Sequence, residues 1–265
     1  LGAKYGSSTG VMNTPHSVTI NGNGHIINFG NFYIKIKPNW TSPSDELNIT
    51  FNDTKLYTAN KYGAVFMNTP SLFSKIRLVY NNVEAIGGTA VFIDTLANTG
   101  QPLKTFEIKG NTSITGVSSY TYNGTTYTSA YNDTALISLA NVVIDNGANV
   151  VLDAGGNALY NIQMHSYEGR QTISIGDNAH VEMKGATAAN VDMSSYNGGN
   201  VINIGNKAYV DMTLSDSGSS ANVDMSSYNR DSTVTINPGA FVSLNGPSNF
   251  NSNNTVTINI DDPSL

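Results

Sequence analysis

The sequence has 265 residues, of which 39% are hydrophobic and 12% are charged, and its formal net charge at neutral pH is −6. It contains no cysteine, which excludes a disulfide framework and any thiolate metal site. The acidic balance argues against nucleic acid as a partner, because phosphate binding needs clustered Lys and Arg. No run of about 18 apolar residues is present, so no transmembrane helix is predicted, and no signal peptide is visible at Leu1.

Pairs of apolar residues two positions apart recur along the whole chain, each with one residue between its members. Such alternation is typical of a strand with one buried face. Gly, Asn, Asp and Ser are frequent between the pairs, where the chain must turn. Successive pairs lie 22 to 36 residues apart, and a repeat in this range indicates stacked units. In chain order the pairs are Val18/Ile20, Ile49/Phe51, Leu78/Tyr80, Phe106/Ile108, Val142/Ile144, Ile173/Ile175, Ile202/Ile204, Val234/Ile236 and Val256/Ile258.

The repeating unit predicts the fold class. Three short strands and three turns in about 30 residues fit one coil of a right-handed parallel β-helix, whose neighbouring coils lie about 4.8 Å apart. The sequence therefore predicts an all-β fold: a single parallel β-helix, or solenoid, of about nine coils with three short strands per coil. We expect one domain over residues 1–265. Because neither end shows a convincing cap against edge pairing, we expect this domain to be a fragment of a longer surface protein.

The residue directly after each apolar pair is usually one that tolerates a sharp corner. Asn and Gly adopt the left-handed backbone conformation at low cost, so we expect the corner at this position. Stacked Asn side chains can also form a hydrogen-bonded ladder from coil to coil. The residues at this position are Asn21, Asn52, Asn81, Lys109, Asp145, Gly176, Gly205, Asn237 and Asn259.

The first departure from the repeat is Asn31–Glu46, which carries Lys35, Lys37 and the single tryptophan, Trp40. These three residues form one candidate ligand-binding segment. Residues 1–110 hold nine basic and six acidic side chains, whereas the rest of the chain holds four and thirteen. The basic first part could favour an anionic glycan, or it could be ordinary scatter of surface charge.

The second departure is Val117–Tyr131, inside the longest step of the repeat. Asn123-Gly124 between alternating residues is a strong signal for a β-hairpin, so a small projecting hairpin is predicted. Tyrosine rings on such a loop can stack on sugars, because their faces are apolar while their hydroxyls form hydrogen bonds. They could equally fold the hairpin onto the solenoid wall. The candidate ligand-binding residues here are Tyr120, Tyr122, Tyr127 and Tyr131.

The clearest copies of the unit lie in the second half of the chain. The phrase Ala-Asn-Val-Asp-Met-Ser-Ser-Tyr-Asn occurs at Ala189–Asn197 and again at Ala221–Asn229. The phrase Ile-x-Ile-Gly-x-x-Ala-x-Val-x-Met occurs at Ile173–Met183 and at Ile202–Met212. Tyr residues after the repeated Ser are expected to stack in phase, either as corner packing or as a recognition strip.

The repeat also generates columns of carboxylates. Glu182 and Asp211 share one position of the second strand, and Asp192 and Asp224 share one position of the third. A solvated acidic face explains these columns, and a weak cation site is the alternative. The four histidines have no metal-ligand spacing, and no carboxylate cluster stands out that the repeat does not explain. We therefore predict no catalytic residue, no metal site and no cofactor. The histidines are His16, His25, His165 and His180.

The segment Val18–Pro38, which reads VTINGNGHIINFGNFYIKIKP, resembles the opening of the pectate-lyase-like adhesive domain of large surface proteins of lactobacilli and related bacteria. The phrase Val-x-Ile-x-x-Gly-Ala-x-Val, at Val142–Val150 and Val234–Val242, is also typical of that family. The resemblance implies a β-solenoid that binds host epithelium, mucus or matrix glycans, without lyase activity, ahead of repeats and a sortase wall anchor. It transfers no site residue.

Together these observations predict the adhesive region of a bacterial cell-surface protein. Its expected partners are host or biofilm glycans, mucin or extracellular-matrix protein, with no nucleic acid and no membrane insertion. We expect a monomer, located outside the cell and anchored to the wall. The alternatives are a polysaccharide lyase or hydrolase acting on uronate-containing glycans, and a passive stalk that projects other domains.

Overall fold

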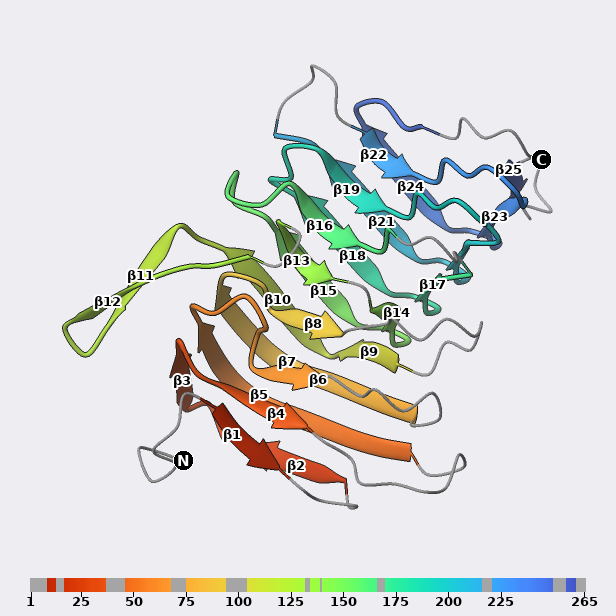
Figure 1. Cartoon of the computed structure of the whole chain (residues 1–265). Coiled ribbons are helices and arrows are strands. Elements are labelled where there is room, and N and C mark those ends of the chain that lie inside the picture. The colour runs from red at the N-terminus through yellow and green to blue at the C-terminus, as the bar shows by residue number, and fades with distance from the viewer. Residues whose placement is uncertain are drawn as a thin grey trace.

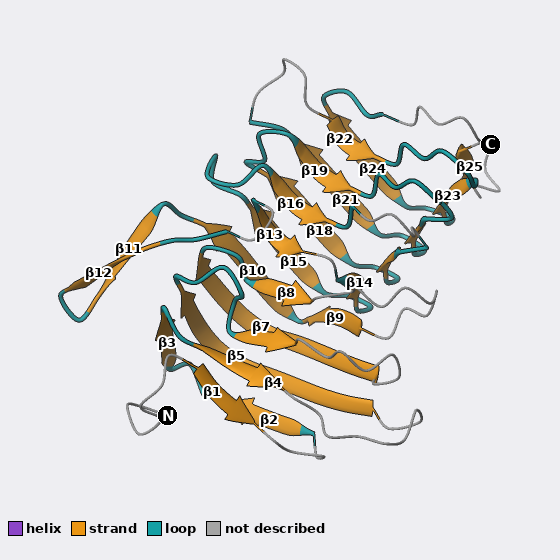
Figure 2. Cartoon of the chain, viewed as in Figure 1, coloured by secondary structure: helices purple, strands orange, loops and turns teal. Residues whose placement is uncertain are grey.

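The computed structural model describes residues 9–12, 17–36, 46–67, 75–93, 104–131, 134–138, 140–165, 170–215, 221–249 and 256–260. Within these ranges the chain consists of strands and turns with no helix, and it winds as a parallel β-solenoid from β1 at one end to β25 at the other (Figures 1 and 2). No helix in the described part is therefore long and apolar enough to cross a membrane. The prediction of an all-β parallel solenoid is confirmed.

Three parallel ladders of strands form the walls of the solenoid, which we call the first, second and third ladders in the order of each coil. The third ladder is a sheet of eight strands. In order these are β1 (Thr9–Met12), β4 (Tyr33–Ile36), β6 (Val65–Met67), β8 (Val91–Ile93), β13 (Ala135–Ser138), β16 (Tyr160–Gln163), β19 (Ala189–Asp192) and β22 (Ala221–Asp224).

The first and second ladders belong to one sheet of 15 strands, because two long strands, β5 and β7, run through both. The first ladder is β2 (Val18–Asn21), β5 (Glu46–Thr58), β7 (Lys75–Gly87), β9 (Lys104–Lys109), β14 (Asn141–Ile144), β17 (Thr172–Ile175), β20 (Val201–Ile204), β23 (Ser232–Ile236) and β25 (Val256–Ile260). The second is β3 (Ile26–Gly30), β5, β7, β10 (Asn111–Gly116), β15 (Asn149–Asp153), β18 (His180–Lys184), β21 (Tyr209–Thr213) and β24 (Phe241–Asn245).

The predicted alignment of the apolar pairs is confirmed for the first eight of them, from Val18 opposite Ile49 to Ile202 opposite Val234. The ninth is wrong by two residues, because Val234 lies opposite Ile258 and not opposite Val256. The count of about nine coils is also too high. Seven coils of the described chain place a strand in every ladder, and the strands after β22 extend only the first and second ladders.

The core is a continuous apolar column that no single coil could form alone. Along the strands, buried residues alternate with more exposed ones, as in β18, where Val181 and Met183 are buried and Glu182 between them is not. In the early coils the core is aromatic: the ring of Phe51 packs edge-on against Phe29 at 6.4 Å and against Tyr80 at 5.7 Å. The side chains that face the core are therefore those that the alternation in the sequence predicts.

The expected asparagine ladder is present in the first coils. Asn52 Nδ2 donates to Asn21 Oδ1 at 2.8 Å, and Asn81 Nδ2 donates to Asn52 Oδ1 at 3.1 Å. A second ladder, which the sequence did not single out, is fully buried in the later coils. Asn161 Nδ2 donates to Asn190 Oδ1 at 2.6 Å, and Asn190 Nδ2 donates to Asn222 Oδ1 at 2.7 Å.

The predicted position of the left-handed corner is wrong. Positive φ angles occur one residue later at Asp53, Asn82 and Gly110, and two residues later at the other corners. A one-residue corner barely interrupts the pairing, which explains why β5 and β7 continue through it as single strands of 13 residues. The corner residues with positive φ are Asn23, Asp53, Asn82, Gly110, Gly147, Asn178, Lys207 and Gly239.

Candidate functional site

The hairpin predicted within Val117–Tyr131 is confirmed. Strands β11 (Ser119–Tyr122) and β12 (Thr125–Thr128) pair in antiparallel register around Asn123 and Gly124, whose φ angles are 48° and 78°. Two positive φ angles in a two-residue turn give the twist that suits a hairpin. In Figure 1 this hairpin projects from the body after β10 and extends toward the end of the solenoid that holds β3.

Tyr120 joins the hairpin to the body of the solenoid. Its ring stacks on Tyr127 across the hairpin with 5.2 Å between ring centroids, and it lies 5.2 Å from the ring of Tyr57 on β5. Its hydroxyl donates a hydrogen bond to Asn28 Oδ1 on β3 at 3.0 Å. Burial raises the pKa of this hydroxyl well above its usual value. Tyr120 therefore serves mainly to hold the hairpin against the first two coils.

Tyr122 and Tyr127 lie on either side of this contact. The Tyr122 ring is 6.0 Å from Tyr57 in an edge-on arrangement. The Tyr127 ring lies so close to Gly30 that a Cβ atom there would be 2.7 Å from Tyr127 Cε1, which explains the need for glycine at that point. Both side chains remain partly exposed, so they offer ring edges and hydroxyls to solvent.

Tyr131, the fourth predicted residue, is placed apart from the other three. It packs against the apolar core, and its hydroxyl lies within hydrogen-bond distance of the carbonyl oxygens of Gly87 at 3.1 Å and Val117 at 2.9 Å. Burial raises the pKa of this hydroxyl to about 12. Tyr131 thus anchors the base of the hairpin. The structure instead places Tyr57 beside Tyr120 and Tyr122.

The second candidate segment is only partly described. Lys35 lies in β4, paired in register with Val11 and Phe66, whereas Lys37 and Trp40 lie outside the described residues. Beside β4 the rings of Tyr33, Tyr62, Phe66 and Phe92 form one cluster, with 4.4 Å between the centroids of Tyr62 and Phe66.

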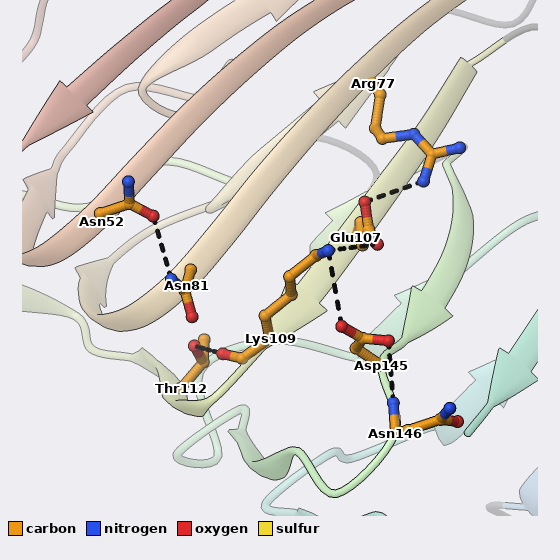
Figure 3. Close-up of polar contacts among 8 residues, drawn as sticks. All are labelled: Asn52, Arg77, Asn81, Glu107, Lys109, Thr112, Asp145 and Asn146. Carbon is orange, nitrogen blue, oxygen red and sulfur yellow. Dashed lines mark hydrogen bonds and ion pairs between the residues drawn. The ribbon is translucent and has the colours of Figure 1, made fainter. Parts of the chain in front are cut away.

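A network of ion pairs lies on the first ladder (Figure 3). One carboxylate oxygen of Glu107 lies 2.9 Å from Arg77 Nη1, and the other lies 3.1 Å from Lys109 Nζ. Lys109 Nζ also lies 3.4 Å from Asp145 Oδ2. The hydrogen bond to Glu107 is the main reason that the pKa of Lys109 is raised. Glu107 is only 7% exposed, and a buried carboxylate needs such partners. Each carboxylate of the network is thus paired with a cation.

The predicted acid columns exist in register: Glu182 lies opposite Asp211, and Asp192 lies opposite Asp224. Glu182 Oε1 lies 3.3 Å from His180 Nε2. Among the described residues, no group of three or more His, Asp or Glu side chains is arranged to hold a metal ion.

One site has the composition of a Ser-His-Asp triad without its geometry. Ser194 Oγ donates to Asp192 Oδ1 at 2.6 Å and lies 2.8 Å from His165 Nδ1. In a hydrolytic triad the serine donates its proton to histidine, and the carboxylate orients that histidine from the other side. Here the serine hydroxyl donates its hydrogen bond to the carboxylate and not to the histidine, so the arrangement supports the turn and does not activate the hydroxyl.

Comparison with known proteins agrees with the resemblance seen in the sequence. Residues 4–92 match a family model described as a pectate lyase-like adhesive domain. Among solved structures, the SRRP of L. reuteri 53608 is similar with a TM-score of 0.68 and 22% identity, over 95% of this chain and 87% of that one. The SRRP of L. reuteri 100-23 is similar with a TM-score of 0.62 and 22% identity, over 96% and 90%. No curated protein matches the chain.

Proposed function

We propose that this chain is the adhesive region of a bacterial cell-surface protein that binds host or biofilm glycans, mucin or extracellular-matrix protein non-covalently. The match of residues 4–92 to an adhesive-domain model carries the proposal. The similarity of nearly the whole chain to two SRRP structures is consistent with one solenoid domain over residues 1–265. In this proposal the domain is part of a longer protein, acts as a monomer outside the cell and is held at the wall.

The binding element is the hairpin together with the wall that it touches. Tyr122 and Tyr127 present partly exposed aromatic rings, and Tyr120 and Tyr57 fix the position of those rings. A ring that is already held in place loses little conformational freedom when a sugar stacks on it. Lys35, Lys37 and Trp40 form the second candidate segment. Weak contacts of this kind give firm attachment when many copies act on one cell surface.

The proposal includes no catalysis, and the adhesive family of residues 4–92 supports that choice. The carboxylates that the fold brings together on the first ladder are paired with Arg77 and Lys109, so they are committed to an ion-pair network. Ser194, whose Oγ lies 2.8 Å from His165 Nδ1, donates its hydrogen bond to Asp192. These arrangements favour structural roles for the polar groups concerned.

The test is a binding screen of the chain against mucin, matrix proteins and neutral and acidic glycans, with simultaneous detection of unsaturated or shortened glycan products. The variant Tyr122→Ala/Tyr127→Ala should weaken binding about tenfold, since aromatic contacts are worth about 0.5–1.5 kcal/mol each. Tyr209→Ala is the matched control, because Tyr209 is an exposed tyrosine on β21, far from the hairpin.

Saturable binding without product, weakened by the hairpin variant and not by the control, would support the proposal. Product formation would replace it with a lyase or hydrolase. A chain that binds none of these materials would instead be a passive stalk. Equal binding by the hairpin variant and the parent would show that the ligand does not contact the hairpin tyrosines. The binding site would then lie on another part of the surface.

A further inference from the structure

Two of the three arginines in the sequence meet at one corner of the solenoid, where the chain passes from the third ladder into the first. The backbone N–H of Arg170 donates to Gly198 O at 3.0 Å, so Arg170 lies beside the next coil. One coil further, a Cβ atom on Gly198 would collide with the carbonyl oxygen of Arg230, which shows how tightly the coils stack here. Residues 60 positions apart in the sequence are thereby brought to the two sides of one turn.

Gly199 lies between the two arginine side chains. A Cβ atom built on it would lie 3.5 Å from Cγ of Arg170 and 3.9 Å from Cδ of Arg230. Its φ of +75° also disfavours any residue with a side chain. The aliphatic parts of both arginines therefore run over the same bare glycine. The two side chains thus leave the backbone on either side of the same point, beside Gly199.

Neither guanidinium group forms an ion pair with a described residue. Both arginines are exposed. Arg77, the third arginine, is by contrast bound to the buried Glu107. Two cations held close together repel each other, and an anion placed between them offsets that repulsion.

Two exposed tyrosines stand in the same turns. Tyr196 and Tyr228 are 43% and 54% exposed and stack on each other with ring centroids 5.0 Å apart. Tyr196 precedes Gly198 by two residues, and Tyr228 precedes Arg230 by two. In these turns Ser195 and Ser227 form an isolated parallel β-bridge, which holds the two turns in register. Flat rings with hydroxyl groups thus border the pair of cations.

Comparison of three copies of this turn shows that the arginines are not part of the repeated sequence. The segments 194–200 and 226–232 read SSYNGGN and SSYNRDS, and residues 165–171 read HSYEGRQ. The central Ser-Tyr recurs in all three, and in the second and third copies along the chain the tyrosine rings stack on each other. The two positions after the turn differ in every copy: Gly-Arg, Gly-Gly and Arg-Asp. Stacking alone does not require an arginine at either position, and the glycines of the middle copy leave room for both.

We propose that the corner formed by Arg170, Gly199 and Arg230 is an oxyanion-binding site that takes a carboxylate or sulfate group of an acidic glycan. The planar guanidinium groups offer paired N–H donors that match such a group, and Tyr196 and Tyr228 contact the sugar that carries it. The inference rests on the proposed adhesive function for the identity of the ligand as a glycan. It adds a second contact surface in coils far from the hairpin.

The overall charge makes this site easy to test. Residues 111–265 contain four basic and thirteen acidic side chains, so this half of the molecule as a whole repels an anionic polymer. Binding there must depend on the local cation pair. Loss of both arginines should then remove most of the binding in this region.

The experiment compares three ligands that differ in their charged group: hyaluronan oligosaccharides with carboxylate only, dextran sulfate with sulfate only, and dextran with neither. The variants are Arg170→Gln, Arg230→Gln and the double variant. The charge-matched control is Lys184→Gln/Lys207→Gln, which removes two exposed cations from the second ladder and its preceding corner. Melting temperatures of all variants are measured first, to show that each is folded.

We expect the parent to bind one or both anionic ligands, with affinity that falls as salt is added, and not to bind dextran. Each single arginine variant should lose about tenfold in affinity and the double variant about a hundredfold, while the lysine control loses much less. Arg170→Lys, which keeps the charge but not the planar fork, should recover only part of the loss. Which anionic ligand responds identifies carboxylate or sulfate as the group bound.

Equal losses of affinity in the arginine and lysine variants would show that binding depends on net charge alone, which would contradict the proposed site. Unchanged binding by the double arginine variant would overturn it as well, and so would failure of the parent to bind either anionic ligand. In each of these cases, binding to mucin or matrix protein that depends on Tyr122 and Tyr127 would leave the adhesive function standing. Loss of that binding too would remove the proposed function itself.

Discussion

Replacement of Phe51 by alanine tests the interior of the solenoid most directly. Phe51 is 0% exposed and its ring packs between Phe29 and Tyr80, so its removal leaves a cavity that neighbouring coils cannot fill without moving their backbones. Buried Phe→Ala changes cost about 3–5 kcal/mol. At roughly 2–4 °C per kcal/mol for a chain of this size, the melting temperature should fall by roughly 6 to 20 °C.

The matched control is Phe241→Ala, which deletes the same side chain at the surface. Phe241 is 54% exposed, and its main contact is a stack on Tyr209 at 5.0 Å. That contact is worth about 0.5–1.5 kcal/mol at most, so the control should melt close to the parent. The assays are thermal unfolding followed by circular dichroism and hydrogen exchange of the backbone amides.

Hydrogen exchange locates the damage, because each coil of a solenoid contacts only its neighbours. Faster exchange in Phe51→Ala should be concentrated in β2, β5 and β7, and amides of β20 and β21 should change little. If Phe51→Ala and Phe241→Ala melted alike, the assignment of inward and outward faces in the early coils would be wrong. Uniformly faster exchange along the whole chain would refute nearest-neighbour stacking as the source of stability.

Two further predictions concern buried polar groups. Asn190→Ala interrupts the ladder between Asn161 and Asn222 and leaves their buried amide groups short of partners, so urea denaturation should show a loss of about 1–3 kcal/mol. Tyr80 is fully buried, and burial raises the pKa of its hydroxyl far above the value of about 10 for an exposed tyrosine. The unfolded chain then releases this proton at lower pH than the folded chain, so stability should fall as pH rises above about 10, and less steeply in Tyr80→Phe.

The strands of this fold were predictable because their pattern has two consistent periods. Within a strand, alternation fixes which side faces the core, and from coil to coil the apolar pairs fix the register, as in Ile173 opposite Ile202. A shift of one residue would turn every buried side chain outward, which excludes odd shifts of the register. At the last strand the alternation continues through Val256, Ile258 and Ile260, and a shift of two residues keeps the same faces, which is why that one alignment was wrong.

The corners and the ion pairs were not predictable for the opposite reason. A corner can turn after one residue, as at Asp53, or after two, as at Asn178, and both satisfy the same apolar pattern. Arg77 and Glu107 lie in different columns as well as in different coils, so their contact depends on both the register and the direction of long side chains. The hairpin itself was predictable from Asn123-Gly124, but its docking onto Asn28 and Tyr57 depends on three-dimensional proximity between coils.

The same physics suggests where on a solenoid a binding site can form. Wherever the repeat is kept, each outward position carries similar residues on successive coils, and stacking uses those residues for contacts with one another, as Tyr209 does with His180 and Phe241. Rings stacked face to face leave mainly their edges for a ligand. A distinct surface arises only where the repeat is broken.

The hairpin is one such break, because it adds residues that no neighbouring coil repeats. The corner of Arg170, Gly199 and Arg230 is another, because adjacent coils place different residues at equivalent positions and leave two cations over a glycine. If adhesion resides at these breaks, variants there should change binding without changing stability. Variants at buried positions of the repeated columns, such as Asn190, should do the reverse. Paired measurements of melting temperature and affinity on Tyr122→Ala/Tyr127→Ala, Arg170→Gln/Arg230→Gln and Asn190→Ala would separate the two classes, and a stability loss in either of the first two comparable to that of Asn190→Ala would contradict the distinction.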